Sequence, residues 1–162
     1  MTADLRSKPT QVVGANLIVN ERAILFVRES KLAALGRWSL PGGRLEAGES
    51  LRAGAAREAF EETGLIVDVG SLLGIYHCPQ TLEGDSAMTF VFRSTVAGGK
   101  LRTSPEHPEA VFFDRHDVEA MLDGNRVRGS HVRLAIAALD LGSELPADVV
   151  THVGPSRPPR AV

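Results

Sequence analysis

The sequence predicts a single α/β domain built on a mixed β-sheet. Apolar runs rich in β-branched residues stand before, between and after segments with helical periodicity. The 162 residues show no internal repeat and no shift in composition that would divide them into two domains. We therefore expect one domain over residues 11–142, a flexible polar arm over residues 1–10 and a Pro-rich, irregular tail over residues 143–162.

Two apolar segments near the N-terminus predict a β-hairpin. Residues 12–20 and 23–30 are rich in Val, Ile and Leu, and a short polar link separates them. The chain then crosses the surface to Trp38, which we expect to turn back into the core. The run Pro41-Gly42-Gly43 predicts a break in regular structure, because glycine permits backbone angles that other residues avoid.

A helix is predicted over residues 51–63, with Ser50 as its N-cap and Gly64 as its stop. Residues 65–78 are expected to be extended, as two strand segments joined at Gly70. The same rules place the remaining elements: strands over residues 87–96 and 109–114, and terminal helices over residues 114–123 and 130–141.

Composition and charge exclude several function classes. The formal net charge is −2, with 43% hydrophobic and 23% charged residues, which is typical of a soluble protein rather than a binder of nucleic acid or membrane surfaces. The first residues lack the apolar segment of a signal peptide, and no apolar run approaches the roughly 20 residues that span a bilayer. Cys78 is the only cysteine, so no disulfide can form within the chain. We therefore expect a cytoplasmic protein with no nucleic-acid and no membrane partner.

The predicted helix over residues 51–63 concentrates carboxylates on one face. Glu58, Glu61 and Glu62 stand at i, i+3 and i+4, and Gly54 lies one turn earlier on the same side. A solvated like-charge pair at this spacing is unfavourable by about 0.2–0.5 kcal/mol, and desolvation increases the repulsion. A divalent cation would reverse it, and oxygen ligands without His or Cys favour Mg²⁺ or Mn²⁺ over Zn²⁺. Taken alone, these glutamates also fit an ordinary solvated helix face.

The other side of this helix is predicted to pack against the rest of the domain. Its side chains are small or apolar, so the helix can lie close to its neighbours. They are Ala53, Ala56, Ala59, Phe60 and Thr63.

The residues around this acidic face match a known signature. Gly43, Glu49, the pair Arg57-Glu58, the pair Glu61-Glu62 and Gly64 occur at the spacing of the signature box of the Nudix hydrolases. The region from residue 43 to 65 therefore resembles that box, and "GRWSLPGG" before it and "EHPEAVFFDRHDVEAM" after it also resemble the family. The resemblance implies the Nudix fold, an α/β/α sandwich with a central mixed sheet. It also implies Mg²⁺-dependent hydrolysis, with Mn²⁺ as a substitute, of a nucleoside diphosphate linked to another group.

The same resemblance assigns roles to residues of the box. Glu58 and Glu62 match positions that usually bind metal, and Glu61 matches a position that binds metal or activates water. Arg57 matches a position that orients a catalytic glutamate, which a fork of N–H donors can do.

The glycines and the first glutamate of the box have supporting roles in the family. Glu49, Gly43 and Gly64 match positions that support the helix and shape the adjoining loops. Gly42 and Gly43 are also expected to face the substrate.

The catalytic base is left open between three glutamates. In many family members it lies on a later loop, where this sequence has Glu106 and Glu109. We favour Glu109, with Glu61 as the alternative. Arg28, at the end of the second predicted strand, either reaches a substrate phosphate or remains a solvated strand end.

Other polar and aromatic residues give weaker indications. The aromatic residues on predicted strands are candidates for stacking on a base, although most are expected in the core: Tyr76, Phe90, Phe92, Phe112 and Phe113. The histidines show no metal-ligand spacing, and each is expected to be exposed or hydrogen bonded: His77, His107, His116, His131 and His152. Cys78 is expected to pack as a small apolar residue.

The box predicts the reaction but not the nucleotide. Pro79 lies near a position where ADP-ribose pyrophosphatases of the superfamily carry proline, so an ADP-sugar and a (deoxy)nucleoside triphosphate are the two expected substrates. The alternatives are a nucleotide-sensing domain without turnover and an isoprenoid diphosphate isomerase, which would need a reactive cysteine. The intact box favours the hydrolase. Family members are often dimers, so the resemblance also implies a homodimer.

Overall fold

The fold is described by a computed structural model over residues 9–82 and 84–153. Its centre is a seven-stranded sheet in the order β3-β2-β1-β6-β5, with β4 paired to β1 and β7 paired to β2. The strands are β1 (Gln11–Asn20), β2 (Ala23–Arg28), β3 (Trp38–Ser39), β4 (Gly42–Arg44), β5 (Leu65–Cys78), β6 (Ala87–Gly99) and β7 (Ala110–Phe113). The α-helices are α1 (Leu51–Thr63), α2 (Arg115–Asp123) and α3 (His131–Leu141), with short 3₁₀ turns at η1 (Leu32–Ala34) and η2 (Ala147–Val149).

The sheet is mixed, as predicted. β1 and β6 run parallel from the pair Gln11–Ala87 to the pair Val19–Thr95. The other strand pairs are antiparallel, including the predicted hairpin of β1 and β2 and the long pairing of β5 with β6. β1 also pairs with β4, the strand that contains Gly42 and Gly43.

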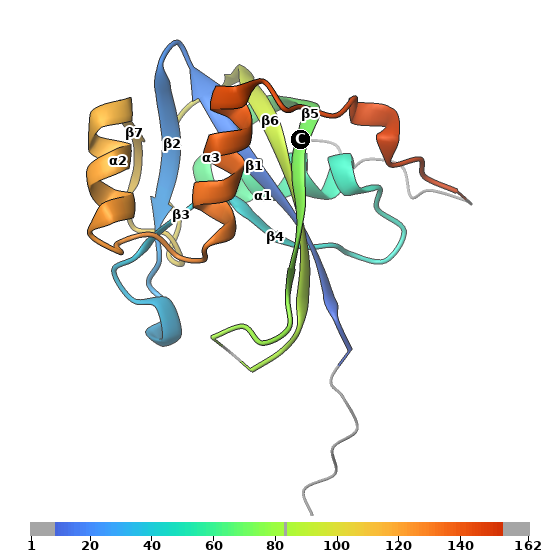
Figure 1. The fold of residues 1–162 in the computed structure, drawn as a ribbon, viewed down its shortest axis with the longest axis horizontal. Helices are drawn as coiled ribbons and strands as arrows, with labels where there is room; N and C mark the ends of the chain where they lie inside the picture. Colours follow the sequence, from blue (N-terminus) through green and yellow to red (C-terminus); the bar gives the residue numbers. More distant parts are fainter. Residues whose placement is uncertain (1–8, 83, 154–162) are drawn as a thin grey trace, which may run out of the picture.

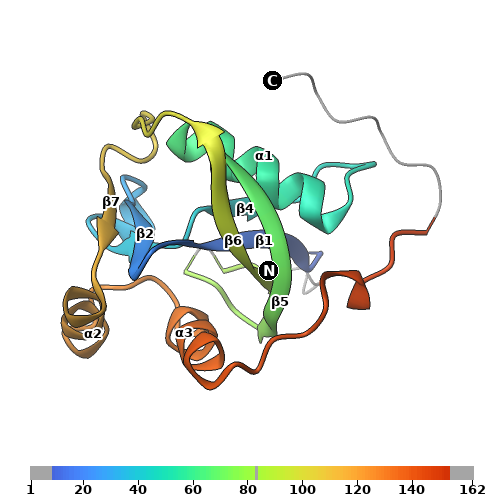
Figure 2. The same cartoon turned by 90° about the horizontal axis from the view of Figure 1, so that it is seen from above.

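Helices cover both faces of the sheet, which confirms the α/β/α sandwich (Figures 1 and 2). Leu17 and Phe26 belong to a core that α2 and α3 cover with Val118, Met121, Val132, Ala135 and Ile136. Their chain neighbours Ile18 and Leu25 belong to the core on the other face, with Ala55 and Ala59 of α1. This alternation along β1 and β2 follows from the period of two in a strand.

Both predicted caps of α1 are confirmed. The Ser50 hydroxyl accepts a hydrogen bond from the Ala53 backbone N–H, and Gly64 ends the helix in the left-handed conformation at φ 73°. The packing face was predicted less well. Ala53 is exposed, whereas Gly54, placed on the acidic side, is buried. Gly54 is buried because the loop before the helix folds back: an added Cβ would lie 2.6 Å from Leu45 Cδ1.

Three other predictions about the backbone are corrected. Gly42 and Gly43 belong to a strand, because β4 pairs with residues 13–15 of β1. Residues 65–78 form one strand with register shifts rather than two segments joined at Gly70. The tail is partly regular where it is described: Leu145 pairs with Leu72 of β5 and η2 follows.

The remaining predictions about the chain ends lie outside the described residues, at 1–8 and 154–162. Across the described ranges, we find no helix with both the length and the apolar character that crossing a membrane requires.

Gly42 is required by the close approach of β4 to β1. A Cβ at this position would lie 2.6 Å from both Ala15 Cα and the Gly14 carbonyl oxygen. We expect Gly42→Ala to lower the free energy of unfolding by about 1–3 kcal/mol, because backbone atoms must move, as measured by urea unfolding. Gly98→Ala is the matched control, since its Cβ would meet nothing nearer than Ile66 Cδ1 at 3.9 Å. Equal losses in the two variants would contradict the steric explanation.

Candidate active site

Arg57 organises the carboxylates of α1 and of the loop before it. Its Nε and Nη2 donate to the two Glu49 oxygens at 2.7 and 3.0 Å, and its Nη1 donates to Glu58 at 2.8 Å and to Glu61 at 3.0 Å. Nη2 also donates to the Arg44 carbonyl at 3.0 Å. The Arg57 side chain is only 13% exposed, so the planar fork holds the largely buried Glu49 and Glu58 and reaches the half-exposed Glu61.

Gly43 makes room for the Glu58 carboxylate. An added Cβ at Gly43 would lie 2.4 Å from Glu58 Cδ, so the helix can bring this carboxylate directly onto β4 only because residue 43 has no side chain. Burial raises the pKa of Glu58, and the Arg57 guanidinium opposes that rise. Gly43 therefore has a steric role within β4 rather than in a loop.

Glu62 lies deeper in the same cluster. Its Oε2 accepts a hydrogen bond from the Gly42 backbone N–H at 3.0 Å, and its Oε1 faces His107 Nδ1 at 3.5 Å. Burial raises the pKa of Glu62 to about 8, while His107 and the Gly42 N–H act in the opposite direction. A carboxylate of this kind is stabilised in its charged form by any cation that reaches it.

Asn16 fixes the position of α1 over this part of the sheet. From the middle of β1 its buried side chain donates to the Ala55 carbonyl at 2.8 Å and accepts from the Ser94 hydroxyl at 3.0 Å. Its backbone N–H donates to the Pro41 carbonyl at 2.8 Å. Through its side chain and its backbone, Asn16 therefore connects the helix to the turn that precedes β4.

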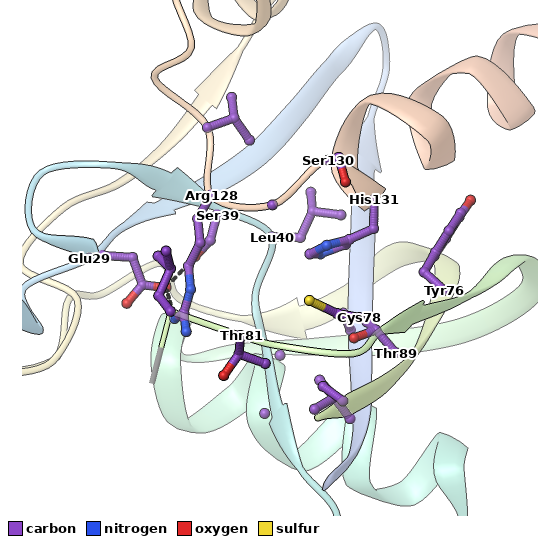
Figure 3. Close-up of a pocket in the computed structure, with 18 of the residues that line it drawn as sticks. Glu29, Ser39, Leu40, Tyr76, Cys78, Thr81, Thr89, Arg128, Ser130 and His131 are labelled. Carbon is purple, nitrogen blue, oxygen red and sulfur yellow. Dashed lines mark hydrogen bonds and ion pairs between the residues drawn. The ribbon is translucent and has the colours of Figure 1, made fainter. Parts of the chain in front are cut away.

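The acidic cluster opens into a cavity of about 1200 Å³. Glu58, Glu61 and Glu62 line one side together with Gly42 and Gly43. The other walls come from the ends of β5 and β6 and from the segment that leads into α3 (Figure 3). The volume exceeds the roughly 300–1,000 Å³ of typical small-molecule sites, so the cavity accommodates a ligand of considerable size next to the carboxylates.

The wall formed by β5 and α3 carries aromatic groups that are neutral at pH 7. The rings of Tyr76 and His131 lie 6.1 Å apart, and both residues line the cavity. Burial raises the pKa of Tyr76, and burial with the nearby Arg128 charge lowers the pKa of His131. These two side chains offer hydrogen-bonding and ring contacts, and Arg128 and Arg133 line the cavity beside them.

A second polar cluster in the cavity wall was not predicted. Glu29, at the end of β2, is buried, and its Oε1 accepts hydrogen bonds from Ser39 Oγ at 2.8 Å and Arg128 Nη1 at 3.0 Å (Figure 3). Burial opposes ionisation of Glu29, but His107, Ser39 and Arg128 together lower its pKa to about 2. The sequence signal was a glutamate just after an apolar strand. Its partners lie on distant segments and could not be read from spacing.

Comparisons with known proteins agree with this geometry. A sequence model described as the NUDIX domain matches residues 8–133. The chain belongs to the Nudix family. The domain is 36% identical, over 63% of this chain and 60% of the relative, to an ADP-ribose pyrophosphatase of Methanocaldococcus jannaschii. It is 41% identical, over 78% of this chain and 90% of the relative, to a MutT-like protein of Streptomyces ambofaciens.

A solved structure shows the same Nudix fold. A NUDIX hydrolase from Nitrosomonas europaea superposes with a TM-score of 0.81 at 25% identity, covering 90% of this chain and 98% of that one. The Nudix chain spans only 36% to 60% of the length of several curated relatives that it matches.

The structure brings most of the predicted site residues of this Nudix domain together. Residues 42, 43, 49, 57, 58, 61 and 62 form one connected cluster. Arg28 and Glu109 lie elsewhere: they form an ion pair with each other, both are nearly half exposed, and neither is among the residues that line the cavity. Glu106 does line the cavity and pairs with Lys31 at 2.9 Å.

Three weaker predictions about single residues have different outcomes. Cys78 is exposed and lines the cavity, so the prediction that it packs as an apolar residue is wrong. His107 is buried rather than exposed, and it lies between two carboxylates, with Nε2 3.7 Å from Glu29 and Nδ1 3.5 Å from Glu62. Phe92 is fully buried, as expected of a strand aromatic, whereas Tyr76 is only partly buried.

The donor set of this Nudix domain fits a hard divalent cation. The acidic side chains of the cluster supply the oxygen ligands that such a cation prefers. Because Gly43 has no side chain, the Glu58 carboxylate can lie at the cavity wall. Within residues 9–82 and 84–153, no three Asp, Glu, His or Cys side chains are already gathered as a metal site. Arg57 binds one oxygen of Glu58 and one of Glu61 by hydrogen bonds.

Glu29 makes the stability of the Nudix domain depend on pH. Its pKa is lowered to about 2 in the folded chain from an ordinary value of 4.5, so it stabilises the fold above pH 4.5 and loses this contribution as the pH falls toward 2. We expect Glu29→Gln to lower the free energy of unfolding by about 3 kcal/mol at pH 7. The difference from wild type should shrink steadily below pH 4.5, as measured by urea unfolding at several pH values. A difference that does not change with pH would contradict the role of the charge.

Proposed function

We propose that this chain is a Mg²⁺-dependent Nudix pyrophosphohydrolase, with Mn²⁺ as a substitute, which cleaves a nucleoside diphosphate linked to another group. The observation that carries the proposal is the opening of the Arg57-centred carboxylate cluster into a cavity of about 1200 Å³ whose wall includes Tyr76 and His131. A diphosphate needs cations near its oxygens, and a nucleoside needs apolar and hydrogen-bonding contacts. The cavity offers a place for both.

Glu58 and Glu62 are the residues proposed to hold the cation, with Glu61 as a third ligand. A divalent ion there would supply charge neutralisation for the phosphate oxygens and a lowered pKa for bound water. The chain's own part is to orient the carboxylates: Arg57 fixes Glu49 and Glu58, and the Gly42 N–H holds Glu62. In the described hydrogen bonds Arg57 binds one oxygen of Glu58 and one of Glu61, so the second oxygen of each carboxylate could hold the ion.

Glu61 is the proposed general base that takes the proton from the attacking water. It lines the cavity, and its carboxylate is half exposed and held from one side by Arg57. The sequence favours Glu109 as the base. Glu109 pairs with Arg28 and does not line the cavity, so its position does not support that role. Glu106 remains the alternative because it also lines the cavity.

ADP-ribose or another ADP-sugar and a (deoxy)nucleoside triphosphate remain the proposed substrates. The ADP-ribose pyrophosphatase among the relatives supports the first of these. The neutral rings of Tyr76 and His131 support contact with a nucleoside base at that end of the cavity. A homodimer and a cytoplasmic location also stay predictions, and the mass of the chain in solution tests the first.

A nucleotide panel with Mg²⁺ and with Mn²⁺ tests the proposal. The panel contains ADP-ribose, other ADP-sugars and the (deoxy)nucleoside triphosphates, and release of nucleoside monophosphate and phosphate is measured. We expect hydrolysis that chelation abolishes. In ¹⁸O-labelled water the label should appear on a phosphate product, since the attack is on phosphorus. Metal-independent binding of a nucleotide without turnover would instead identify a sensing domain.

A further inference from the structure

His107 lies buried between two carboxylates that come from opposite sides of the site. Its Nδ1 is 3.5 Å from Glu62 Oε1, and its Nε2 is 3.7 Å from Glu29 Oε2. The His107 side chain is only 6% exposed, and its Nδ1 makes no hydrogen bond to any part of the chain that is described. These distances are too long for strong hydrogen bonds, so the contacts are those of an electrostatic bridge.

The backbone fixes where this imidazole sits. Ser104 and His107 exchange backbone hydrogen bonds at 3.0 and 3.1 Å, and the Ser104 hydroxyl accepts from the His107 N–H at 3.1 Å. The neighbouring Glu106 carbonyl accepts from both the Ser30 N–H at 3.1 Å and the Ser30 hydroxyl at 2.7 Å. The turn is therefore attached to the end of β2, next to Glu29.

Glu29 continues the bridge to the cavity wall. Its Oε1 accepts hydrogen bonds from Ser39 and from Arg128. Arg128 is held by its backbone, because its N–H donates to the Trp38 carbonyl at 2.7 Å. Its side chain is 30% exposed and lines the cavity (Figure 3). The chain of contacts Glu62–His107–Glu29–Arg128 thus runs from α1 to the Arg128 guanidinium, which lines the cavity.

The proposed cation ligand Glu62 needs such a bridge. Among the hydrogen bonds described for its side chain, the Gly42 N–H binds only Oε2, and a carboxylate held at one oxygen turns readily about its last torsion. His107 stands at the other oxygen. Partners behind a metal-binding group set its direction and its affinity. Each ring nitrogen of His107 faces a carboxylate, which a side chain that only fills space would not require.

We propose that His107 is a positioning residue, which orients the Glu62 carboxylate and connects it through Glu29 to Arg128 in the cavity wall. The inference rests on the proposed function in one respect, namely the assignment of Glu62 to the cation. The contacts themselves do not depend on that assignment.

Double-mutant cycles test the bridge without any turnover. The unfolding equilibrium in urea is measured for His107→Ala, Glu62→Gln and Glu29→Gln, and for the two doubles that contain His107→Ala. We expect each double to depart from additivity by at least about threefold in the equilibrium constant, as groups in contact do. In the control cycles His116→Ala replaces His107→Ala, because His116 is exposed on α2. The doubles of His116→Ala with Glu62→Gln and with Glu29→Gln should be additive. Additive effects in both His107 cycles would overturn the proposal.

Binding of Mn²⁺ tests the consequence for the site. Free Mn²⁺ is followed by electron paramagnetic resonance during titration of the full chain, and kcat and KM are measured with the best nucleotide of the panel. We expect His107→Ala to weaken Mn²⁺ binding or lower kcat by about 10–100-fold, as loss of a group behind a ligand does. KM should change less than kcat. His107→Asn, which keeps a donor toward Glu62, should recover part of the loss.

The outcomes separate the bridge from the function. If His107→Ala matches wild type in Mn²⁺ affinity and kcat, the positioning role is overturned while hydrolysis stands. If the cycles show coupling but the wild-type chain neither takes up Mn²⁺ nor cleaves a nucleotide, the bridge is supported and the proposed function falls.

Discussion

Replacing Glu62 by Gln is expected to lower the metal-dependent kcat by at least about 100-fold. The amide keeps the size of the side chain but removes the charge at a buried position whose oxygens face the cavity and the Gly42 N–H. Loss of one preorganised electrostatic group in a site that excludes water typically has an effect of this size. The measurement is kcat at saturating Mg²⁺ with the best nucleotide of the panel.

The fold of this variant should remain intact. The amide keeps the volume of the side chain, and its carbonyl oxygen can still accept the hydrogen bond from the Gly42 N–H. Glu119→Gln is the matched control, because Glu119 is exposed on α2 outside the cavity lining, and it should retain wild-type turnover. Wild-type activity in Glu62→Gln would exclude Glu62 from the cation site.

Replacing Arg57 by Leu is expected to lower both stability and activity. The variant leaves Glu49, Glu58 and Glu61 without their shared donor, and removing one partner of a buried ion pair typically costs about 3–5 kcal/mol. We expect a loss near 3 kcal/mol in the free energy of unfolding, measured in urea at pH 7. Because the carboxylates then lose their fixed directions, kcat should also fall by about 10–100-fold.

Arg57→Lys separates charge from geometry. Lysine keeps the positive charge but cannot reproduce the fork that binds both Glu49 oxygens and Glu58 together. We expect it to recover most of the stability and little of the activity. Full activity in Arg57→Lys would show that Arg57 acts only as a counter-charge.

The sequence predicted local features well where the cause is local. The helix that begins after Ser50 and ends before Gly64 depends on caps that lie within it. The alternation of Ile18 and Leu25 with Leu17 and Phe26 depends on the period of a strand. The acidic face needed only the i, i+3 and i+4 spacing of Glu58, Glu61 and Glu62.

Other features escaped prediction because contacts distant in sequence decide them. Gly42 and Gly43 form a strand only because β1 is there to pair with. Gly54 is buried because Leu45 folds over it. Cys78 is exposed because its end of β5 borders the cavity rather than the core.

By itself the sequence determined the family box, the two-sided helix and the oxygen-rich character of the site, since each lies within one short stretch of chain. Tertiary structure alone decided which side chains share the cavity. It paired Arg28 with Glu109 away from the cavity, and it brought His107 between Glu29 and Glu62. Such pairings join segments up to 99 positions apart, as in Arg128 and Glu29. No periodicity along the chain encodes them, because they arise only when the sheet brings those segments together.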